Sequence, residues 1–274
     1  QDPGHPSTPH PSLQSRLLHC EADMTPPEVE VLEPGMVIVR GLVCDEEQKR
    51  MALEAWSWGT KDPEYGFFLN DGKLNASTRG RLYDAAERYP AWVKKACDDA
   101  VVFARQADPA MPPMTFTHLI TNCYMTRDGV QWHRDLYEND GKSDHPVVNL
   151  TIGASAIFAW KHERDEPERS VLLQSGDALL FGGPCRLVLH AVHEVLLEQV
   201  PAWMGSDFEP GPMRFSLTFR DAPEVRGRED EFKYFKFSSS MPEQEQFDQV
   251  ARKQRQALPR AYQPPEVARP RAGA

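Results

Sequence analysis

The sequence predicts a mainly β protein with flanking helices, built as a sandwich or jelly roll. Between residues 116 and 220, short β-prone segments alternate with Gly, Asp and Pro turn signals, which is typical of these two architectures. Two helical patterns precede this region. A chain of 274 residues can bury a large β-rich core within one domain.

The first elements are a strand pair and a helix. Residues 1–28 are rich in Pro, Ser and His, so they are predicted to be a disordered tail. A turn at Pro34-Gly35 then leads into a short β-branched strand. A helix with an acidic first turn opens at Cys44 and is expected to run to about Trp56.

Residues 57–90 form a long segment rich in Gly, Asn and aromatic residues. We expect irregular structure with room for a hairpin, serving either as a functional lid or as a surface excursion packed by its own aromatic rings. A helix is predicted over residues 90–107, because apolar residues recur there at three- and four-residue spacing.

The strands form the next part of the chain. They are predicted over residues 116–125, 147–152, 156–160, 170–174, 178–181, 187–190 and 214–220. The expected domain therefore covers residues 29–228. A strand and helix extension is predicted over 229–258, and a disordered Pro-rich tail over 259–274.

Composition excludes several classes of protein. The formal net charge is −10, so nucleic acid would be bound only through a local basic patch. The five cysteines are widely spread and include no Cys-x-x-Cys pair, which argues against a disulfide framework and a structural zinc site. We expect a monomer in the nucleus or cytoplasm, without a membrane span.

One short motif suggests a metal site. His133 and Asp135 are two residues apart, so on a strand both side chains would point to the same side. With a distant His190 they would offer two imidazoles and one carboxylate, the ligand set of non-heme Fe(II) oxygenases. The pattern alone is weak, because the chain contains nine histidines.

The segment 214–220 alternates strictly between polar and apolar residues. Arg214, Ser216, Thr218 and Arg220 share one face. That face belongs either to an ordinary exposed strand or to the wall of a ligand cavity, where the two arginines would bind a dicarboxylate. A second strand offers a matching face, formed by Ile120, Asn122 and Tyr124.

From about residue 31 to 221 the chain resembles the AlkB family of Fe(II)/2-oxoglutarate dioxygenases. Six blocks carry the resemblance in the family's order. They are Leu32-Glu33-Pro34-Gly35, Asn122-x-Tyr124, His133-x-Asp135, Leu150 to Phe158, Leu172 to Asp177 with Gly182 to His190, and Arg214-x-Ser216-x-Thr218-x-Arg220.

This resemblance implies a double-stranded β-helix, or jelly roll, in which His133, Asp135 and His190 hold Fe(II). The co-substrate 2-oxoglutarate would bind Arg214, with Ile120, Asn122, Tyr124, Ser216 and Arg220 around it. O2 would take the open metal position. The implied reaction hydroxylates a methyl group on an N-methylated base and releases formaldehyde, succinate and CO2.

The chain departs from the family pattern at two positions. Ser216 stands where the signature has Asn, so one amide is missing from the co-substrate wall. Tyr137 stands where the bacterial repair enzyme has an acidic residue tied to base recognition. The segment Arg79-Gly80-Arg81-Leu82-Tyr83 resembles the nucleotide-recognition lid, and Arg79, Arg81 and Tyr83 would supply cations and a stacking ring, unless the segment is an ordinary solvated loop.

Three functions remain open. The first is oxidative demethylation of DNA or RNA bases. The second is hydroxylation of a protein or small molecule, which suits the acidic composition. The third is a cupin-like binding protein with an inert metal, which would have no need for two arginines. A basic rim from Lys73, Arg79 and Arg81 would favour the first.

Overall fold

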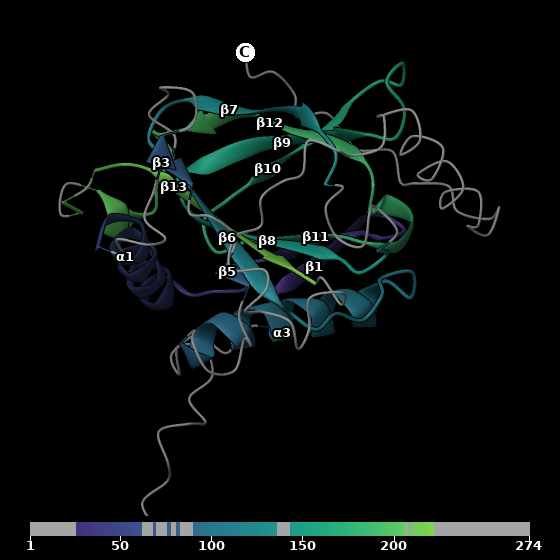
Figure 1. Cartoon of the computed structure of the whole chain (residues 1–274), viewed down its shortest axis with the longest axis horizontal. Coiled ribbons are helices and arrows are strands. Elements are labelled where there is room, and N and C mark those ends of the chain that lie inside the picture. The colour runs from purple at the N-terminus through teal and green to yellow at the C-terminus, as the bar shows by residue number, and fades with distance from the viewer. Residues whose placement is uncertain are drawn as a thin grey trace, which may run out of the picture.

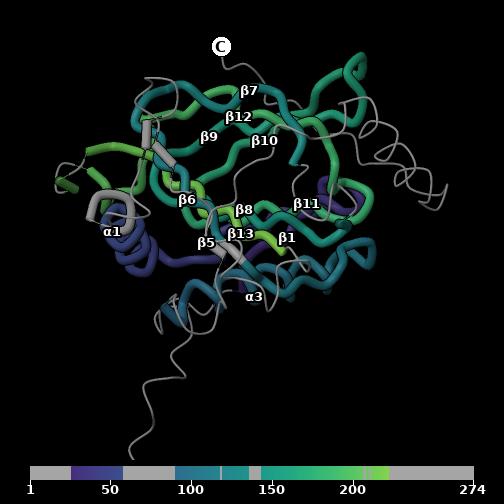
Figure 2. Tube along the Cα trace, in the orientation of Figure 1, coloured from purple at the N-terminus to yellow at the C-terminus, as the bar shows by residue number. Residues whose placement is uncertain are grey.

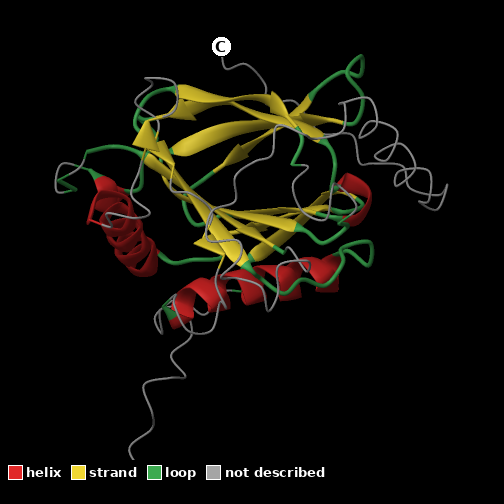
Figure 3. Cartoon of the chain, in the orientation of Figure 1, coloured by secondary structure: helices red, strands yellow, loops and turns green. Residues whose placement is uncertain are grey.

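In the computed structural model, two β-sheets face each other and helices cover one of them. The structure describes residues 26–61, 68–69, 76–77, 81–82, 90–135, 143–205, 208–209 and 211–221. Within these ranges the strands form a nine-stranded major sheet and a four-stranded minor sheet. Figure 3 shows the sheets as two layers, with the helices outside them. The predicted mainly β fold with a jelly-roll core is confirmed.

The major sheet joins segments that are far apart in the chain. Its order is β1-β2-β11-β8-β13-β6-β4-β3, with β5 also paired to β6. The N-terminal hairpin of β1 and β2, purple in Figure 2, joins β11 through β2. Its strands are β1 (Glu28–Glu33), β2 (Met36–Arg40), β3 (Phe68–Leu69), β4 (Ala76–Ser77), β5 (Arg81–Leu82), β6 (His118–Tyr124), β8 (Val147–Gly153), β11 (Ala178–Phe181) and β13 (Arg214–Arg220).

The minor sheet has the order β10-β9-β12-β7. Its strands are β7 (Asp128–His133), β9 (Ser155–Lys161), β10 (Arg169–Leu173) and β12 (Leu189–Leu196). In the described ranges, two short 3-10 turns, η3 (Gly183–Cys185) and η4 (Ala202–Met204), lie in connections between strands. Figure 1 shows this sheet lying over β8 and β11.

Among the described residues, the two long helices are α1 (Asp45–Lys61) and α3 (Ala91–Ala107). Helix α3 contacts β1, β2, β8 and β11, so it covers the outer face of the major sheet. Its buried residues, from Trp92 to Ala104, have the helical spacing that predicted it. Helix α1 continues to Lys61, past the predicted end near Trp56, and includes Gly59, a residue type that often ends helices.

Strand alternation divides the interior into two cores. On β11, Ala178 and Leu180 pack toward the helices, whereas Leu179 and Phe181 pack between the sheets. On β13, the apolar face of Phe215, Leu217 and Phe219 joins the helical core. The polar face of this strand therefore lies on the side of the minor sheet.

The predicted strands from 116 to 220 are all present. Strand β12 is longer than predicted, since it continues past His190 to Leu196. In the segment 57–90, β3 and β4 pair antiparallel, as a hairpin would. The turn between β8 and β9 needs Gly153, whose φ is 95° and whose added Cβ would lie 2.3 Å from the Met213 carbonyl oxygen.

The cysteine prediction needs one correction. Cys44 takes part in a disulfide, although no disulfide was expected. Cys97, Cys123 and Cys185 are free and buried. In the part of the chain that the structure describes, no helix is both long and apolar enough to cross a membrane. The expected C-terminal extension at 229–258, and both predicted tails apart from residues 26–28, lie outside the described residues.

A buried charged cluster ties the major sheet to the minor sheet. Glu33 at the end of β1 accepts hydrogen bonds from Trp160 Nε1 at 2.6 Å and Arg169 Nη1 at 2.8 Å. Its Oε2 also lies 3.0 Å from His162 Nε2. Burial alone would raise the pKa of Glu33, but His162, then Arg169 and Trp160, lower it to about 2 from 4.5.

Glu33→Gln should destabilise the protein by about 2 kcal/mol at neutral pH, because Arg169 and His162 lose the buried carboxylate that they share. A carboxyl group whose pKa is lower in the folded state than in the unfolded state stabilises the fold above its unfolded pKa. This stabilisation is lost as the pH falls from about 4.5 toward about 2. Urea unfolding over a pH series should show that the stability difference between Glu33→Gln and wild type becomes smaller across this pH range. Glu30→Gln, at an exposed glutamate of the same strand, is the control, and a deficit independent of pH would contradict the assignment.

Candidate functional site

Two histidines and one aspartate converge at the edge of the interior. The ligand atoms of His133, Asp135 and His190 all lie within 4.8 Å of one another. Asp135 Oδ1 is 3.8 Å from His133 Nε2, and its Oδ2 is 3.7 Å from His190 Nε2. Asp135 and His190 are buried, whereas the side chain of His133 is 41% exposed. The cluster therefore opens toward solvent on the His133 side.

Strand register explains why these distant residues meet. His133 and His190 are direct partners in the antiparallel pair β7 and β12, and their ring centres are 4.2 Å apart. The prediction that Asp135 shares a strand with His133 is wrong, because β7 ends at His133. The carboxylate still reaches the two imidazoles because the chain beyond the strand end carries it there.

The hydrogen bonds of both rings leave the same nitrogen for a metal. His133 Nδ1 is 2.8 Å from the Gln131 carbonyl oxygen, and His190 Nδ1 is 3.1 Å from that of Val188. Each Nδ1 therefore carries the proton and donates, which leaves the Nε2 lone pair toward Asp135. This is how proteins orient metal-binding imidazoles, so the donor set fits Fe(II).

The protonation states of this cluster favour binding of a cation. Burial, followed by His133, lowers the pKa of His190 to about 3, so its ring is neutral. Burial alone would raise the pKa of Asp135, but Arg220, then His190 and His133, hold it well below its usual range. Arg220 Nη2 lies 2.8 Å from Asp135 Oδ1. A neutral imidazole and an ionised carboxylate are the forms that bind metal.

Two buried arginines link the segments that carry Asp135 and His190 by hydrogen bonds, an arrangement called the clasp below. Arg134 donates to the carbonyl oxygen of Leu187, in the loop before His190, and to that of His162 at 2.8 Å. Arg186, in that same loop, donates to the carbonyl oxygen of Asp135 at 2.6 Å. Each segment thus holds the backbone of the other.

Arg134→Ala should weaken Co(II) or Fe(II) binding by about 10- to 100-fold, the usual cost of losing a group that orients metal ligands. The reason is that the Leu187 and His162 carbonyls would lose a buried donor. Anaerobic metal titration followed by tryptophan fluorescence measures this. Arg127→Ala, at an exposed arginine paired with Glu194 and Glu198, is the control, and unchanged metal affinity in Arg134→Ala would contradict the clasp.

A polar wall forms where β6 pairs with β13. Register sets Arg214 opposite Tyr124, Ser216 opposite Asn122 and Thr218 opposite Ile120. All seven residues of β13 are buried, so the alternative of an ordinary exposed strand is wrong. The structure therefore brings all six predicted co-substrate residues onto adjacent strands: Ile120, Asn122, Tyr124, Arg214, Ser216 and Arg220.

Arg214 is fully buried without a carboxylate partner among the described residues. Its Nη2 donates to Thr151 Oγ1 at 3.1 Å and Asn149 Oδ1 at 3.3 Å. In the described part of the chain its Nε and Nη1 have no hydrogen-bond partner. Burial lowers the pKa of Arg214. A buried cation with unsatisfied donors is costly unless an anion completes it, so this wall fits a carboxylate ligand.

Two residues of this wall were not predicted from the sequence. Asn149 and Thr151 lie on β8, which pairs with β13 on the side opposite β6. They alternate with the buried Val148 and Leu150. That polar alternation inside an apolar strand was the signal available in the sequence.

Most predicted substrate residues lie outside the described residues: Lys73, Arg79, Tyr83 and Tyr137. Only the backbone of Arg81 is described, where β5 pairs with β6 opposite Leu119. Since Leu119 is adjacent to Ile120, this pairing places residues 81–82 beside the strand that carries the co-substrate wall.

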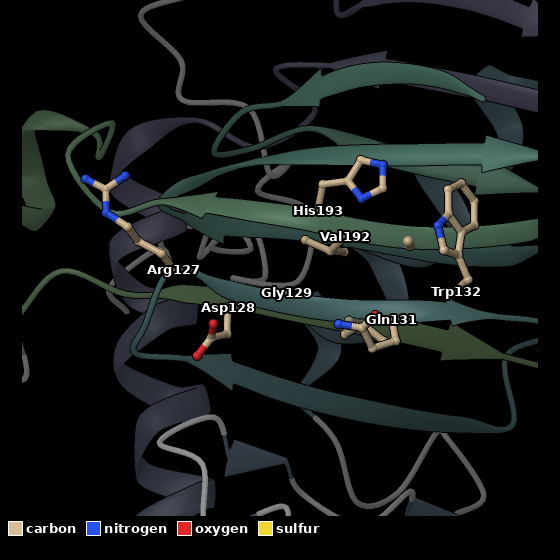
Figure 4. A pocket seen from close by; sticks show the side chains of 9 residues that line it. Arg127, Asp128, Gly129, Gln131, Trp132, Val192 and His193 are labelled. Atoms are coloured by element: carbon tan, nitrogen blue, oxygen red, sulfur yellow. The ribbon is translucent and has the colours of Figure 1, made fainter. Parts of the chain in front are cut away.

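Two other features of the described residues are not part of this site. Glu33, His162 and Cys185 are close enough to hold a metal, but Arg169 already neutralises the Glu33 carboxylate. Figure 4 shows a pocket along β7 and β12 lined by Arg127, Trp132 and His193, among others. Its volume of about 170 Å³ is below the usual range for small-molecule sites.

Trp132, the residue before the ligand candidate His133, does not lie in the core. The ring is partly exposed. It lies 4.7 Å below Lys161 Nζ and 5.4 Å from the ring of His193. The residue between Gln131 and His133 therefore belongs to the outer surface of the minor sheet, not to the interior.

A jelly roll with two imidazoles and one carboxylate beside a buried arginine wall defines the class of non-heme iron oxygenases. Residues 45–220 match the model of the 2OG-Fe(II) oxygenase superfamily, and the chain belongs to this family, with AlkB-like relatives. Family membership implies Fe(II) as the metal, with 2-oxoglutarate and O2 as co-substrates.

Similar proteins include two from Arabidopsis thaliana, DNA N(6)-methyladenine demethylases ALKBH1D and ALKBH1C. They are 33% and 31% identical over 76% and 69% of this chain. The chain spans about half the length of these relatives, 55% and 49%. The AlkB homolog of Caulobacter vibrioides is 31% identical over 55% of this chain and 66% of its own length.

Among solved structures, that of OsALKBH1 shares the fold, with a TM-score of 0.62 at 23% identity. It covers 71% of this chain and 100% of the solved chain. The family model and the sequence relatives confirm the resemblance to the AlkB family.

Proposed function

We propose that this protein is an Fe(II)- and 2-oxoglutarate-dependent demethylase of N-methylated bases in DNA or RNA. The observation that carries the proposal is a three-ligand cluster beside a buried arginine with unsatisfied donors. Bound Fe(II), with 2-oxoglutarate and O2, supplies hydroxylation of a C–H bond and conversion of the co-substrate to succinate and CO2. On an N-methyl group the product is an unstable hemiaminal that releases formaldehyde.

The residues of the site divide this work. His133, Asp135 and His190 would hold the metal through two imidazoles and one carboxylate. Arg214 binds the far carboxylate of 2-oxoglutarate. Burial raises the pKa of Tyr124, so its phenol stays protonated and can donate a hydrogen bond to the same anion.

The remaining predicted wall residues have supporting roles. Asn122, Ser216 and Ile120 line the co-substrate position, and Arg220 keeps Asp135 ionised. For substrate binding we propose Arg79, Arg81, Tyr83 and Tyr137, as cations and aromatic faces for an extruded base.

The nucleic-acid substrate is supported by relatives named for DNA N(6)-methyladenine demethylation. The net charge of −10 means that binding must use a local cationic surface. We place the activity inside the cell, in the nucleus or cytoplasm, where such substrates occur.

The test is formaldehyde and succinate release with Fe(II), 2-oxoglutarate and a panel of methylated oligonucleotides. The panel should include N6-methyladenine and ring-methylated bases, in single- and double-stranded DNA and RNA. We expect formaldehyde and succinate in equal amounts from at least one substrate, and none from unmethylated oligonucleotides. Succinate without formaldehyde across the panel would replace the proposal with hydroxylation of a protein or small molecule. Absence of both products would overturn it.

A further inference from the structure

The co-substrate wall contains an amide that the sequence pattern had counted as missing. Ser216 occupies the position where the AlkB signature has Asn, so β13 itself offers only a hydroxyl there. On the neighbouring strand, Asn149 Nδ2 lies 2.6 Å from Ser216 Oγ and 3.0 Å from Thr218 Oγ1. An amide from β8 thus fills the gap on β13.

The orientation of this amide follows from its partners. Arginine has no acceptor, so the atom of Asn149 that faces Arg214 Nη2 must be the carbonyl oxygen. The NH2 group then faces the two hydroxyls, and Ser216 Oγ accepts from it. Register explains the reach, because Asn149 is the direct partner of Thr218, and Ser216 is two residues before Thr218.

The Asn149 amide also determines which hydrogen-bond donors of Arg214 remain available to a ligand. Nη2 carries two hydrogens, and its two acceptors are Asn149 Oδ1 and Thr151 Oγ1. Among the described residues, Nε and Nη1 have no partner. Strand β8 therefore holds Nη2, and the Tyr124 ring lies 5.1 Å from the guanidinium carbon. Nε and Nη1 are the donors that remain for an anion.

We propose that Asn149 is a positioning residue for 2-oxoglutarate, replacing from β8 the amide absent at position 216 and fixing Arg214 for the far carboxylate. This inference rests on the function proposed above. Asn149 acts through Arg214 and Ser216. Loss of the Asn149 side chain weakens binding of the far carboxylate of 2-oxoglutarate. The residues that bind the metal and the 2-oxo acid end are unchanged.

The experiment measures anaerobic binding of two 2-oxo acids to the full chain loaded with Fe(II). The visible charge-transfer absorption of the complex is the readout, so no turnover is needed. 2-Oxoglutarate has the far carboxylate, and pyruvate lacks it. Asn149→Ser should weaken the binding of 2-oxoglutarate by about tenfold. Its affinities for pyruvate and Co(II) should stay within about twofold of wild type.

The sharper test is a swap. In the double variant Asn149→Ser with Ser216→Asn, the amide returns to β13, and 2-oxoglutarate affinity should recover to within about threefold of wild type. Gln174→Ser, which removes an exposed amide after β10, is the matched control and should not change the affinity for either 2-oxo acid. Asn149→Asp is a second variant, since it keeps the acceptor toward Arg214 but places a negative charge near the anion, and should weaken 2-oxoglutarate further.

The outcomes separate this inference from the proposed function. Unchanged 2-oxoglutarate affinity in Asn149→Ser, or equal weakening of both acids, would overturn the positioning role. A swap variant that folds but does not regain affinity would overturn the amide replacement. If wild type binds no 2-oxoglutarate, the proposed function itself fails, and the inference fails with it.

Discussion

Replacing Asp135 with alanine should reduce succinate formation by about a thousandfold or more, because bound metal supplies several kcal/mol of the catalysis. The two imidazoles that remain bind Fe(II) poorly without an anionic ligand. The variant also leaves Arg220 without the carboxylate oxygen 2.8 Å away. The measurement is initial succinate release, together with anaerobic Fe(II) titration.

Loss of folding must be separated from loss of the metal. Asp135→Asn keeps the shape of the side chain but not its charge, so we expect it to fold better than Asp135→Ala and still lose most activity. Asp128→Ala, at the exposed start of β7, should retain activity. Substantial turnover by a folded Asp135→Ala protein would rule out the metal assignment.

Replacing Arg214 with methionine should have opposite effects on stability and on co-substrate binding. The guanidinium is fully buried, and its Nε and Nη1 have no partner among the described residues. An apolar side chain of similar length removes that cost, so the ligand-free variant should unfold at equal or higher urea concentration than wild type. Its affinity for 2-oxoglutarate should fall by about 100-fold, because the charge-assisted bonds to the far carboxylate are gone.

The measurement is urea unfolding with and without 2-oxoglutarate in the presence of a redox-inert metal. Wild type should gain about 2.7 kcal/mol at a ligand concentration 100 times the dissociation constant, and Arg214→Met at that same concentration should gain less than about 0.5 kcal/mol. Arg214→Lys should behave more like methionine than wild type, since an ammonium cannot reproduce the planar donor set. Arg127→Met, at an exposed arginine, is the control. Equal stabilisation of wild type and Arg214→Met by 2-oxoglutarate would contradict the role of Arg214.

Much of the fold followed from local pattern. The strand segments between 116 and 220 and the helix over 90–107 were predictable because alternation and helical spacing are properties of a short stretch of chain. The boundaries were less predictable at α1 and β12, which both continue beyond the predicted ends. Local signals place the ends of an element less reliably than they place its middle.

The candidate site divides in the same way. His133, Asp135 and His190 were identifiable because their types and order match a family pattern, although Asp135 proved to lie beyond the strand end. The acceptors of Arg134 and Arg186 were not identifiable, since both arginines donate to backbone carbonyls more than 25 residues away in sequence. Backbone acceptors leave no trace in residue types.

The sequence by itself determined which residues share a face of β13 and that this face carries two arginines. Only the tertiary structure decided that the face is buried, that Asn149 and Thr151 hold Arg214, and that His133 meets His190. The physical reason is register. Alternation within one strand is set by backbone geometry, whereas the partner across the ladder depends on how two distant strands align, and a shift of one residue would exchange every neighbour.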